Sequence, residues 1–431
     1  METLETYLDR KHRELGLLNG CLLRPSPLKR PASVAEVIER KFHVAAALKA
    51  EHALHDWAHT ETDWAHAGRP RAGPFRFSYD YQRADLRVSG PSFYEPGCAA
   101  HDTLYTSSGM GAISALLLAS VHLMSAANLM VLPGTYGETL ELIEGYARHL
   151  RLIPLKGSRD EMMLPAAYPS VLLLDSCTSI AAFEAVLGCT RAEFELVVFD
   201  TTCFSNGSGR IRRVVNWARR RRLPIVLVRS HTKLDSLGVE YGRLGSAVFI
   251  PGARPEWLTQ LAAETRNAVR LLGNAALPAH FPPYVGTRAY RALTNKRVAA
   301  ILRNSRRAAR IFGATLPCSF DQLHVAHGLY VTLSSKRTLD EQQARQIAAD
   351  MSGDLSKSGL PLRHAGSFGF DFAATEWFHD AISDRYAVRI AVPDLPTALW
   401  DEVAHAVSRW WSAHEGRETS GGMHQTPATA S

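Results

Sequence analysis

The stretch Ile225-Val-Leu-Val-Arg-Ser-His-Thr-Lys233 places four apolar residues directly before a polar run that ends in a lysine. A short, continuous apolar run is typical of a strand buried on both faces of a parallel sheet. Ligands bind such sheets outside the carboxyl ends of the strands, where Lys233 is expected to lie. Desolvation there would lower the pKa of a lysine and make it a Schiff-base nucleophile. Taken alone, an ordinary loop lysine remains the simpler interpretation.

Four other apolar segments have the length and composition of buried strands. They are Leu129-Met-Val-Leu132, Val171-Leu-Leu-Leu174, Leu196-Val-Val-Phe199 and Ala247-Val-Phe-Ile250. Helix-like stretches separate the segments that begin at residues 129, 171, 196 and 225, which is the pattern of βαβ units. The sequence therefore predicts an α/β fold with a mostly parallel sheet.

The chain divides into five predicted regions. Residues 1–74 form a helical N-terminal extension, in which Val34 to Trp57 shows apolar residues at helical spacing and Ser33 with Glu36 fits a capping box. Glycine, proline and aromatic residues gather in a joint at 274–295, after a large domain at 75–273. A smaller α+β domain spans 296–415, with helices at 291–312, 340–358 and 397–414 and strands at 329–333 and 386–392. The polar residues 416–431 are expected to be disordered.

Two further segments fall where ligands bind an open sheet. Thr106-Ser-Ser-Gly-Met-Gly-Ala112 leads into a long predicted helix, where backbone N–H groups favour a phosphate. A plain serine N-cap is the alternative interpretation. Asp200 directly follows a buried strand, where an unpaired carboxylate is costly. It could cap the turn that comes next, or it could bind a cationic ligand nitrogen.

The order of these segments resembles the fold-type-I pyridoxal 5'-phosphate (PLP) enzymes of the aspartate-aminotransferase superfamily, and within them the cystathionine synthase and lyase branch. Five segments carry the resemblance, which covers about residues 75–395: Ser107-Ser-Gly-Met110, Tyr136-Gly-Glu-Thr139, Asp200-Thr-Thr-Cys203, Ser230-His-Thr-Lys233 and Ser367-Phe-Gly369. A sixth point of similarity is Arg389 in its predicted strand. The resemblance implies a large PLP-binding domain and a smaller C-terminal domain, preceded here by a longer helical extension.

The resemblance assigns a role to each matching residue. Lys233 would carry PLP as a Schiff base, Asp200 would keep the pyridine nitrogen protonated and Tyr136 would stack on the ring. Arg389, with Ser367 nearby, would bind the substrate α-carboxylate. The residues implied to bind the cofactor, mainly around its phosphate, are Ser107, Ser108, Gly109, Met110, Ser179, Ser230, Thr232, Arg243 and, from a neighbouring protomer, Tyr79 or Tyr81.

Two segments depart from the lyase branch. Asp175-Ser-Cys-Thr-Ser179 stands where that branch has an asparagine near the cofactor's phenolic oxygen. Arg243-Leu-Gly245 is more similar to the Arg-x-Gly of aminotransferases, whose arginine binds phosphate. Side-chain specificity is expected from four aromatic residues: Phe281, Tyr284, Phe368 and Phe370.

Three functions remain open at this point. The first is γ-elimination or γ-replacement on an α-amino acid through a vinylglycine-type intermediate, with a sulfur or sulfonium leaving group, in specialised metabolism. The second is an aminotransferase, favoured by Arg243. The third is a non-catalytic PLP-fold partner protein, against which the set of Lys233, Asp200 and Arg389 argues. A homodimer or dimer of dimers with shared active sites would follow from the resemblance.

Composition bears on the partners, metal content and cellular compartment expected for the protein. The content of 46% hydrophobic and 21% charged residues is typical of a globular protein, and the longest apolar stretch, 113–131, is interrupted by polar residues and favours a buried helix over a membrane span. The net charge of +7 comes from local arginine clusters that are typical of solvated helix faces, so no nucleic-acid partner is expected. Six scattered cysteines without CxxC spacing favour reduced thiols and no metal site. The N-terminus lacks a signal peptide, which favours a cytoplasmic protein.

Overall fold

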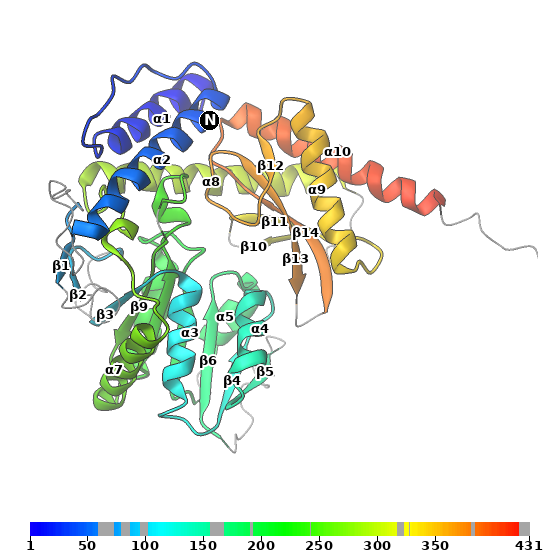
Figure 1. Cartoon of the computed structure of the whole chain (residues 1–431). Helices are drawn as coiled ribbons and strands as arrows, with labels where there is room; N and C mark the ends of the chain where they lie inside the picture. The colour runs from blue at the N-terminus through cyan, green and yellow to red at the C-terminus, as the bar shows by residue number, and fades with distance from the viewer. Residues whose placement is uncertain are drawn as a thin grey trace, which may run out of the picture. The chain divides into compact units, whose positions relative to one another are not determined.

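The computed structural model describes residues 1–58, 73–78, 87–94, 102–155, 168–189, 193–241, 243–316, 323–326, 328–380 and 384–421. The chain divides into two compact units. The larger one comprises Leu8–Val298 with Asp380–Ser383, and the smaller one comprises Met1–Tyr7, Ala299–His379 and Asp384–Ser431. The smaller unit contains a five-stranded sheet, and the larger unit contains a seven-stranded sheet and a two-stranded sheet of β1 (Arg76–Ser78) and β2 (Arg87–Ser89) (Figure 1).

A seven-stranded sheet forms the centre of the larger unit, in the order β3-β9-β8-β7-β6-β4-β5. Its strands are β3 (Asp102–Thr106), β4 (Ala127–Val131), β5 (Leu150–Pro154), β6 (Ser170–Asp175), β7 (Leu196–Asp200), β8 (Ile225–Ser230) and β9 (Gly245–Ile250). The five strands β8, β7, β6, β4 and β5, in that sheet order, pair in parallel. Strand β9 is antiparallel to both of its neighbours, β3 and β8. All five predicted strands of this region are confirmed, and β3 and β5 are additional.

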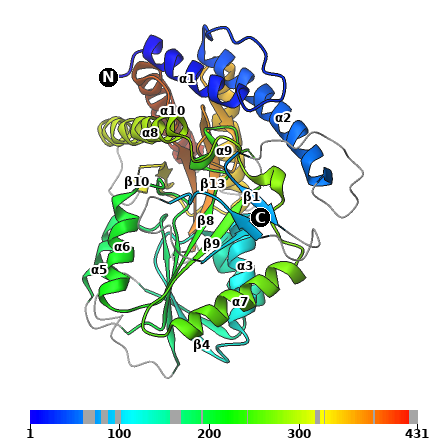
Figure 2. The ribbon, with the colours of Figure 1, turned by 90° about the vertical axis from the view of Figure 1, so that its left-hand side faces the viewer.

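Both faces of this sheet are covered by helices, which explains why its central strands are apolar throughout. Along β7, Leu196 and Val198 face one hydrophobic core, while Val197 and Phe199 face the other. Burying each such side chain contributes about 1.5–3 kcal/mol. Figure 2 shows α5 and α6 on one side of the sheet and α3 and α7 on the other. The helices are α3 (Gly109–Ser120), α4 (Gly137–Tyr146), α5 (Ile180–Gly188), α6 (Gly209–Arg220) and α7 (Pro255–Leu271).

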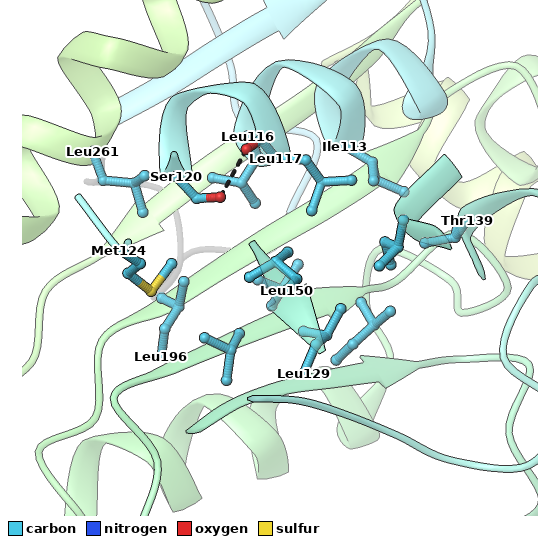
Figure 3. Close-up of a pocket in the computed structure, with 14 residues that line it drawn as sticks. Ile113, Leu116, Leu117, Ser120, Met124, Leu129, Thr139, Leu150, Leu196 and Leu261 are labelled. Carbon is cyan, nitrogen blue, oxygen red and sulfur yellow. Dashed lines mark hydrogen bonds between the residues drawn. The ribbon is translucent and has the colours of Figure 1, made fainter. Parts of the chain in front are cut away.

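The core between α3 and the sheet contains a small apolar cavity of about 30 Å³ (Figure 3). Leucine, isoleucine and methionine side chains line most of it, and the Ser120 hydroxyl at its edge donates a hydrogen bond to the Leu117 carbonyl oxygen at 2.7 Å. This volume is that of a packing defect and is far below the size of a cofactor site.

Two N-terminal helices belong largely to the larger unit. They are α1 (Leu4–Asn19) and α2 (Val34–Ala58), and Leu18 and Leu48 join a third hydrophobic core with the aromatic residues of the joint. The Ser33 hydroxyl accepts a hydrogen bond from the Glu36 N–H, as predicted, while the Glu36 carboxylate accepts from the Ala32 N–H. The extension is therefore anchored by apolar packing rather than being a separate appendage.

The smaller unit is an α+β assembly with a five-stranded sheet in the order β10-β11-β14-β13-β12. Its elements are α8 (Arg288–Thr315, which begins in the larger unit), β10 (Leu323–Ala326), β11 (Tyr330–Leu333), α9 (Glu341–Lys357), β12 (Leu362–His364), β13 (Ala373–Asp380), β14 (Arg385–Ala391) and α10 (Thr397–Gly421). The predicted helices and strands of this region are all present. Asp340 caps α9 through the Gln343 N–H, and the Gln343 side chain accepts from the Asp340 N–H.

Two predicted boundaries were wrong. The apolar stretch 113–131 is not one helix, because α3 ends at Ser120 and β4 begins at Ala127. Helix α10 continues to Gly421, so residues 416–421 are helical and not part of a disordered tail. In both cases local composition is a weak guide to where an element ends, since helix ends are set by caps and tertiary packing.

Candidate active site

Three polar residues end three neighbouring strands of the large sheet. Asp175 ends β6, Asp200 ends β7 and Ser230 ends β8. Asp175 and Asp200 are paired in register, and the next residue after Asp175, Ser176, donates its N–H to the Asp200 carbonyl oxygen at 2.9 Å. Parallel pairing therefore brings the segments that follow these strands together at one edge, as the sequence predicts.

A chain of hydrogen bonds connects Asp200 to the segment that carries the lysine. The Thr202 N–H donates to Asp200 Oδ1 at 2.8 Å, and the Ser230 N–H donates to the Thr202 hydroxyl at 3.0 Å. The Ser230 and Thr232 hydroxyls are 2.9 Å apart. Burial raises the pKa of Asp200, while the bonds from Thr202 and the charge of Arg229 act in the opposite direction.

Lys233 begins a single turn of 3₁₀ helix, Leu234–Ser236, and is only partly buried. Its Nζ lies 3.4 Å from Oε1 of Glu240, and the two side chains are 24% and 38% exposed. An ion pair of this length and exposure is weak, at about 0–1 kcal/mol. This contact is therefore weak enough for a ligand to replace it.

A cavity of about 660 Å³ opens beside Lys233 within the larger unit. It is lined by Lys49, Ala53, Ser107, Ser108, Thr232, Lys233, Glu240, Arg243, Ala279 and His280. Three cationic side chains face one carboxylate here, together with several hydroxyls, so the lining favours an anion with many oxygen acceptors.

Five lining residues were not predicted: Lys49 and Ala53 from α2, Glu240, and Ala279 and His280 from the short 3₁₀ helix Pro278–His280. Nδ1 of His280 accepts the Leu277 N–H at 3.1 Å, so the ring carries its proton on Nε2. Burial, assisted by the charge of Arg243, lowers the pKa of His280 to about 4. The ring is therefore neutral at pH 7.

The phosphate-loop candidate forms the start of α3. The Ser108 hydroxyl accepts the Gly111 N–H at 2.9 Å, which is the plain N-cap that the sequence left open, and the Ser107 hydroxyl bonds to the Asn274 side chain. Gly109 approaches β8 closely: a Cβ there would lie 2.9 Å from Cβ of Ser230. Met110 accepts from the Thr139 hydroxyl at 3.7 Å. The loop and the lysine segment are thus packed against each other.

Tyr136 stands at the N-cap of α4, and its side chain is 37% exposed. Its N–H donates to Asp175 Oδ2 at 2.9 Å, while the Cys177 N–H donates to Oδ1 at 2.7 Å. Burial, followed by repulsion from Asp200, raises the pKa of Asp175 to about 7. Asp175 therefore connects Tyr136, the predicted stacking residue, to β7, which ends in Asp200.

Arg229 and Asp235 form a fully buried pair behind the lysine, which sequence reasoning missed. Nε and Nη2 of Arg229 contact the two Asp235 oxygens at 2.7 and 2.9 Å, and Nη1 donates to the carbonyl oxygens of Thr201 and Phe204, both at 2.8 Å. Burial alone would raise the pKa of Asp235, but the Arg229 charge and the hydrogen bonds hold it below its usual range.

His231 completes this buried network. Its Nδ1 lies 2.8 Å from Asp235 Oδ2 and its Nε2 lies 2.8 Å from the Ser246 hydroxyl on β9, while Phe93 packs on the ring at 3.8 Å between centroids. Burial lowers the pKa of His231. The sequence signal was available: an arginine one residue before Ser230 on a buried strand points to the opposite face and must be paired.

Arg389 lies in β14 of the smaller unit and is 5% exposed. Its guanidinium packs over the rings of Tyr330, at 5.1 Å, and Phe378. Among the described residues, its Nε atom has no hydrogen-bond partner. Ser367 is 9% exposed, and the adjacent Phe368 contacts Tyr330 at 5.2 Å between ring centroids. A buried guanidinium with a donor left over is typical of an arginine that binds an anion.

Several other predicted site residues have different surroundings. The Ser179 hydroxyl accepts the Ala182 N–H and caps α5. Phe281 and Tyr284 are 0% and 1% exposed and pack in the third hydrophobic core, so they are structural residues and do not line the cavity. Phe370 stacks on Phe372 at 4.6 Å. Tyr79 and Tyr81 lie outside the described residues, and their role stays a prediction.

Within the described part of the chain, no helix has the length and apolar character needed to cross a membrane. The same residues contain no group of three or more histidine, cysteine or acidic side chains placed to hold a metal ion.

The chain matches no protein-family model and no curated protein sequence. It is similar in structure to MetB from Corynebacterium glutamicum, with a TM-score of 0.51 and 13% identity over 93% of this chain and 98% of that one. It is also similar to cystathionine γ-synthase from Xanthomonas oryzae pv. oryzae in complex with cystathionine, with a TM-score of 0.50 and 16% identity over 84% and 98% of the two chains. The predicted fold, that of the fold-type-I PLP enzymes, is therefore confirmed.

Proposed function

We propose that this chain is a PLP-dependent enzyme that acts on an α-amino acid, with Lys233 as the residue that binds the cofactor. One observation supports this most strongly. Lys233 opens onto a cavity at the carboxyl ends of the parallel strands, in a fold that its structural neighbours share, and a hydrogen-bond chain joins its segment to Asp200.

The residues around the cavity fit the phosphate of such a cofactor. The hydroxyls of Ser108 and Thr232, the guanidinium of Arg243 and the N-terminus of α3 supply donors and positive charge, while the Ser107 hydroxyl donates to the Asn274 side chain. The Ser108 hydroxyl accepts the Gly111 N–H as the cap of α3, and its own O–H can still donate to a phosphate oxygen. The volume of about 660 Å³ is within the ordinary range of cofactor sites.

Asp200 is suited to hold a protonated ring nitrogen. One of its oxygens is fixed by the Thr202 N–H, and the carboxylate stands at the end of β7. When bound, PLP supplies an electron sink for the bond that breaks at the substrate Cα. The ion pair between Asp200 and the ring nitrogen would keep that nitrogen protonated and would itself favour the ionised carboxylate, against the effect of burial.

Lys233 is suited to move a proton once it has released the cofactor to a substrate amine. Its contact with Glu240 is long and partly exposed, and its neutral amine would take the proton from a Cα–H bond and return it elsewhere on the substrate. Arg389 is proposed to grip the substrate carboxylate, because its guanidinium is buried and its Nε keeps a spare donor among the described residues.

For the reaction, we propose γ-elimination or γ-replacement with a sulfur or sulfonium leaving group. The Ser-Ser-Gly-Met and Tyr-Gly-x-Thr segments support it, and a structural neighbour is a cystathionine γ-synthase bound to cystathionine. An aminotransferase is the second candidate, favoured by Arg243, which lines the cavity. The proposal includes a homodimer, which sedimentation of the purified chain would test.

Deuterium exchange separates the two reactions. The purified protein, supplied with PLP, would be incubated in heavy water with cystathionine and, separately, with S-adenosylmethionine. We expect deuterium at both Cα and Cβ of the recovered amino acid, with release of the γ-substituent, and neither with Lys233→Ala. Conversion of the cofactor to its amine form without exchange at Cβ would establish the aminotransferase instead. Absence of both, in protein that binds PLP, would contradict the proposal.

A further inference from the structure

Two buried thiols lie together at the carboxyl ends of β6 and β7. The Sγ atoms of Cys177 and Cys203 are 3.1 Å apart, and the residues are 8% and 6% exposed. Cys177 comes two residues after Asp175, and Cys203 comes three residues after Asp200. The pair therefore sits on the two short segments that hold both carboxylates of the candidate active site.

The two thiols lie just beyond two adjacent parallel strands. Asp175 of β6 and Asp200 of β7 are paired in register, and the cysteines follow them in the segments after the strands. The Cys203 N–H donates to the Ser176 hydroxyl at 2.9 Å, so the two segments are tied directly beside the sulfurs. Bond formation requires the two Sγ atoms to approach by about 1 Å.

We propose that Cys177 and Cys203 form a reversible dithiol–disulfide pair whose oxidant is a hydroperoxide. One thiolate attacks the peroxide oxygen, which breaks the O–O bond and leaves a sulfenic acid and an alcohol, or water when the oxidant is hydrogen peroxide. The second thiol attacks that sulfur, forms the S–S bond and releases water. In sum, two thiols lose two electrons and two protons, and the O–O bond is reduced.

Oxidation changes the surroundings of Asp175. The Cys177 thiol hydrogen-bonds to that carboxylate, which lowers its pKa, and a disulfide has no S–H to donate. The cross-link also ties the Tyr136–Asp175 contact more firmly to the β7 segment. This inference goes beyond the proposed function and does not require the cofactor.

The test uses the full-length protein, reduced and then treated with hydrogen peroxide, with remaining thiols alkylated in denaturant and the chain digested for mass spectrometry. We expect a peptide pair joined through Cys177 and Cys203, two hydrogens lighter than the free peptides, that dithiothreitol separates. Cys189→Ser is the matched control, since Cys189 is equally buried, and it should form the same cross-link.

Cys177→Ser and Cys203→Ser should each abolish the cross-link, and alanine at either position gives a second variant should serine disturb folding. Quantitative alkylation of both thiols after peroxide treatment would overturn the proposal. A cross-link of Cys177 or Cys203 to a different cysteine, or oxidation that dithiothreitol does not reverse, would overturn it as well. Because mass is the readout, failure here is distinct from failure of the protein to bind PLP.

Discussion

The segment from Arg229 to Asp235 has two faces that differ in every physical respect. On the inner face, Arg229, His231 and Asp235 are 0% exposed and linked by hydrogen bonds of 2.7 to 2.9 Å. On the cavity face, Lys233 is 24% exposed and its contact with Glu240 is 3.4 Å long. Alternation along β8 separates Arg229 from Ser230, while His231, Lys233 and Asp235 lie beyond the strand, in the turn and the 3₁₀ helix that follow it, so the division is made by that turn.

The difference separates positioning from chemistry. The inner face is a rigid ionic network that fixes where the backbone of the segment lies, and its charges are too well paired to react. The cavity face places the Lys233 side chain beside an open cavity, where a group that must bind, release and move protons can reach a ligand. Variants on the two faces should therefore fail in different ways.

The largest effect should come from the inner face. Asp235→Asn leaves the Arg229 guanidinium buried without a counter-charge, and breaking such a pair costs about 3–5 kcal/mol. We expect the free energy of unfolding, measured by urea denaturation, to fall by that amount. A loss below about 1 kcal/mol would mean that the inner face is not a tight ionic network.

Asp200→Asn tests the residue that hydrogen bonds connect, through Thr202, to the segment carrying Lys233. The variant keeps the shape of the side chain and should bind PLP through the phosphate contacts, but it no longer favours a protonated ring nitrogen. We expect kcat to fall by at least about two orders of magnitude, with little change in PLP affinity. Steady-state kinetics with a PLP titration would check this. If the variant kept most of the wild-type rate, Asp200 would not be the residue that keeps the ring nitrogen protonated.

Arg389→Lys extends the comparison to the smaller unit, where Nε of a buried guanidinium has no hydrogen-bond partner among the described residues. Lysine keeps the charge but loses the two-point geometry of the guanidinium. We expect the apparent KM for the amino acid to rise about tenfold or more, since a charged hydrogen bond contributes about 1.5–3 kcal/mol. The cofactor absorbance should not change. Loss of PLP with unchanged KM would make Arg389 a structural or phosphate-binding residue.

The smallest effect on stability should come from the cavity face. Glu240→Gln removes the partner of Lys233 but disturbs only a partly exposed pair, so the free energy of unfolding should change by less than about 1 kcal/mol. This variant is the matched control for Asp235→Asn. If the two variants lost equal stability in the same urea experiment, the division between the faces would be contradicted.

Sequence reasoning found the sheet because its strands are continuous apolar runs between helices. It missed β3 and β5, in which polar or charged residues break the apolar pattern. Lys233 and Asp200 could be placed at strand ends because parallel topology brings those ends together, whereas the loop at Ser107 was recognised by its small residues before a predicted helix.

The residues that line the cavity could not all be predicted from the sequence in this way. Lys49 reaches it from a helix nearly two hundred residues before Lys233, and no local pattern encodes that proximity. Phe281 and Tyr284 were wrongly expected near a substrate, because an aromatic residue in a proline-rich joint has the same sequence signature whether it faces a ligand or a core. Here Leu18 and Leu48 of the N-terminal helices help to bury it.

The central claim, that Lys233 carries the cofactor, can be tested by chemical trapping. The protein would be incubated with PLP, reduced with borohydride and mapped by peptide mass spectrometry. We expect a phosphopyridoxyl group on Lys233, and loss of the visible absorbance in Lys233→Ala but not in Lys49→Ala, the other lysine of the cavity. Trapping on Lys49 or elsewhere, or an adduct that persists in Lys233→Ala, would contradict the account.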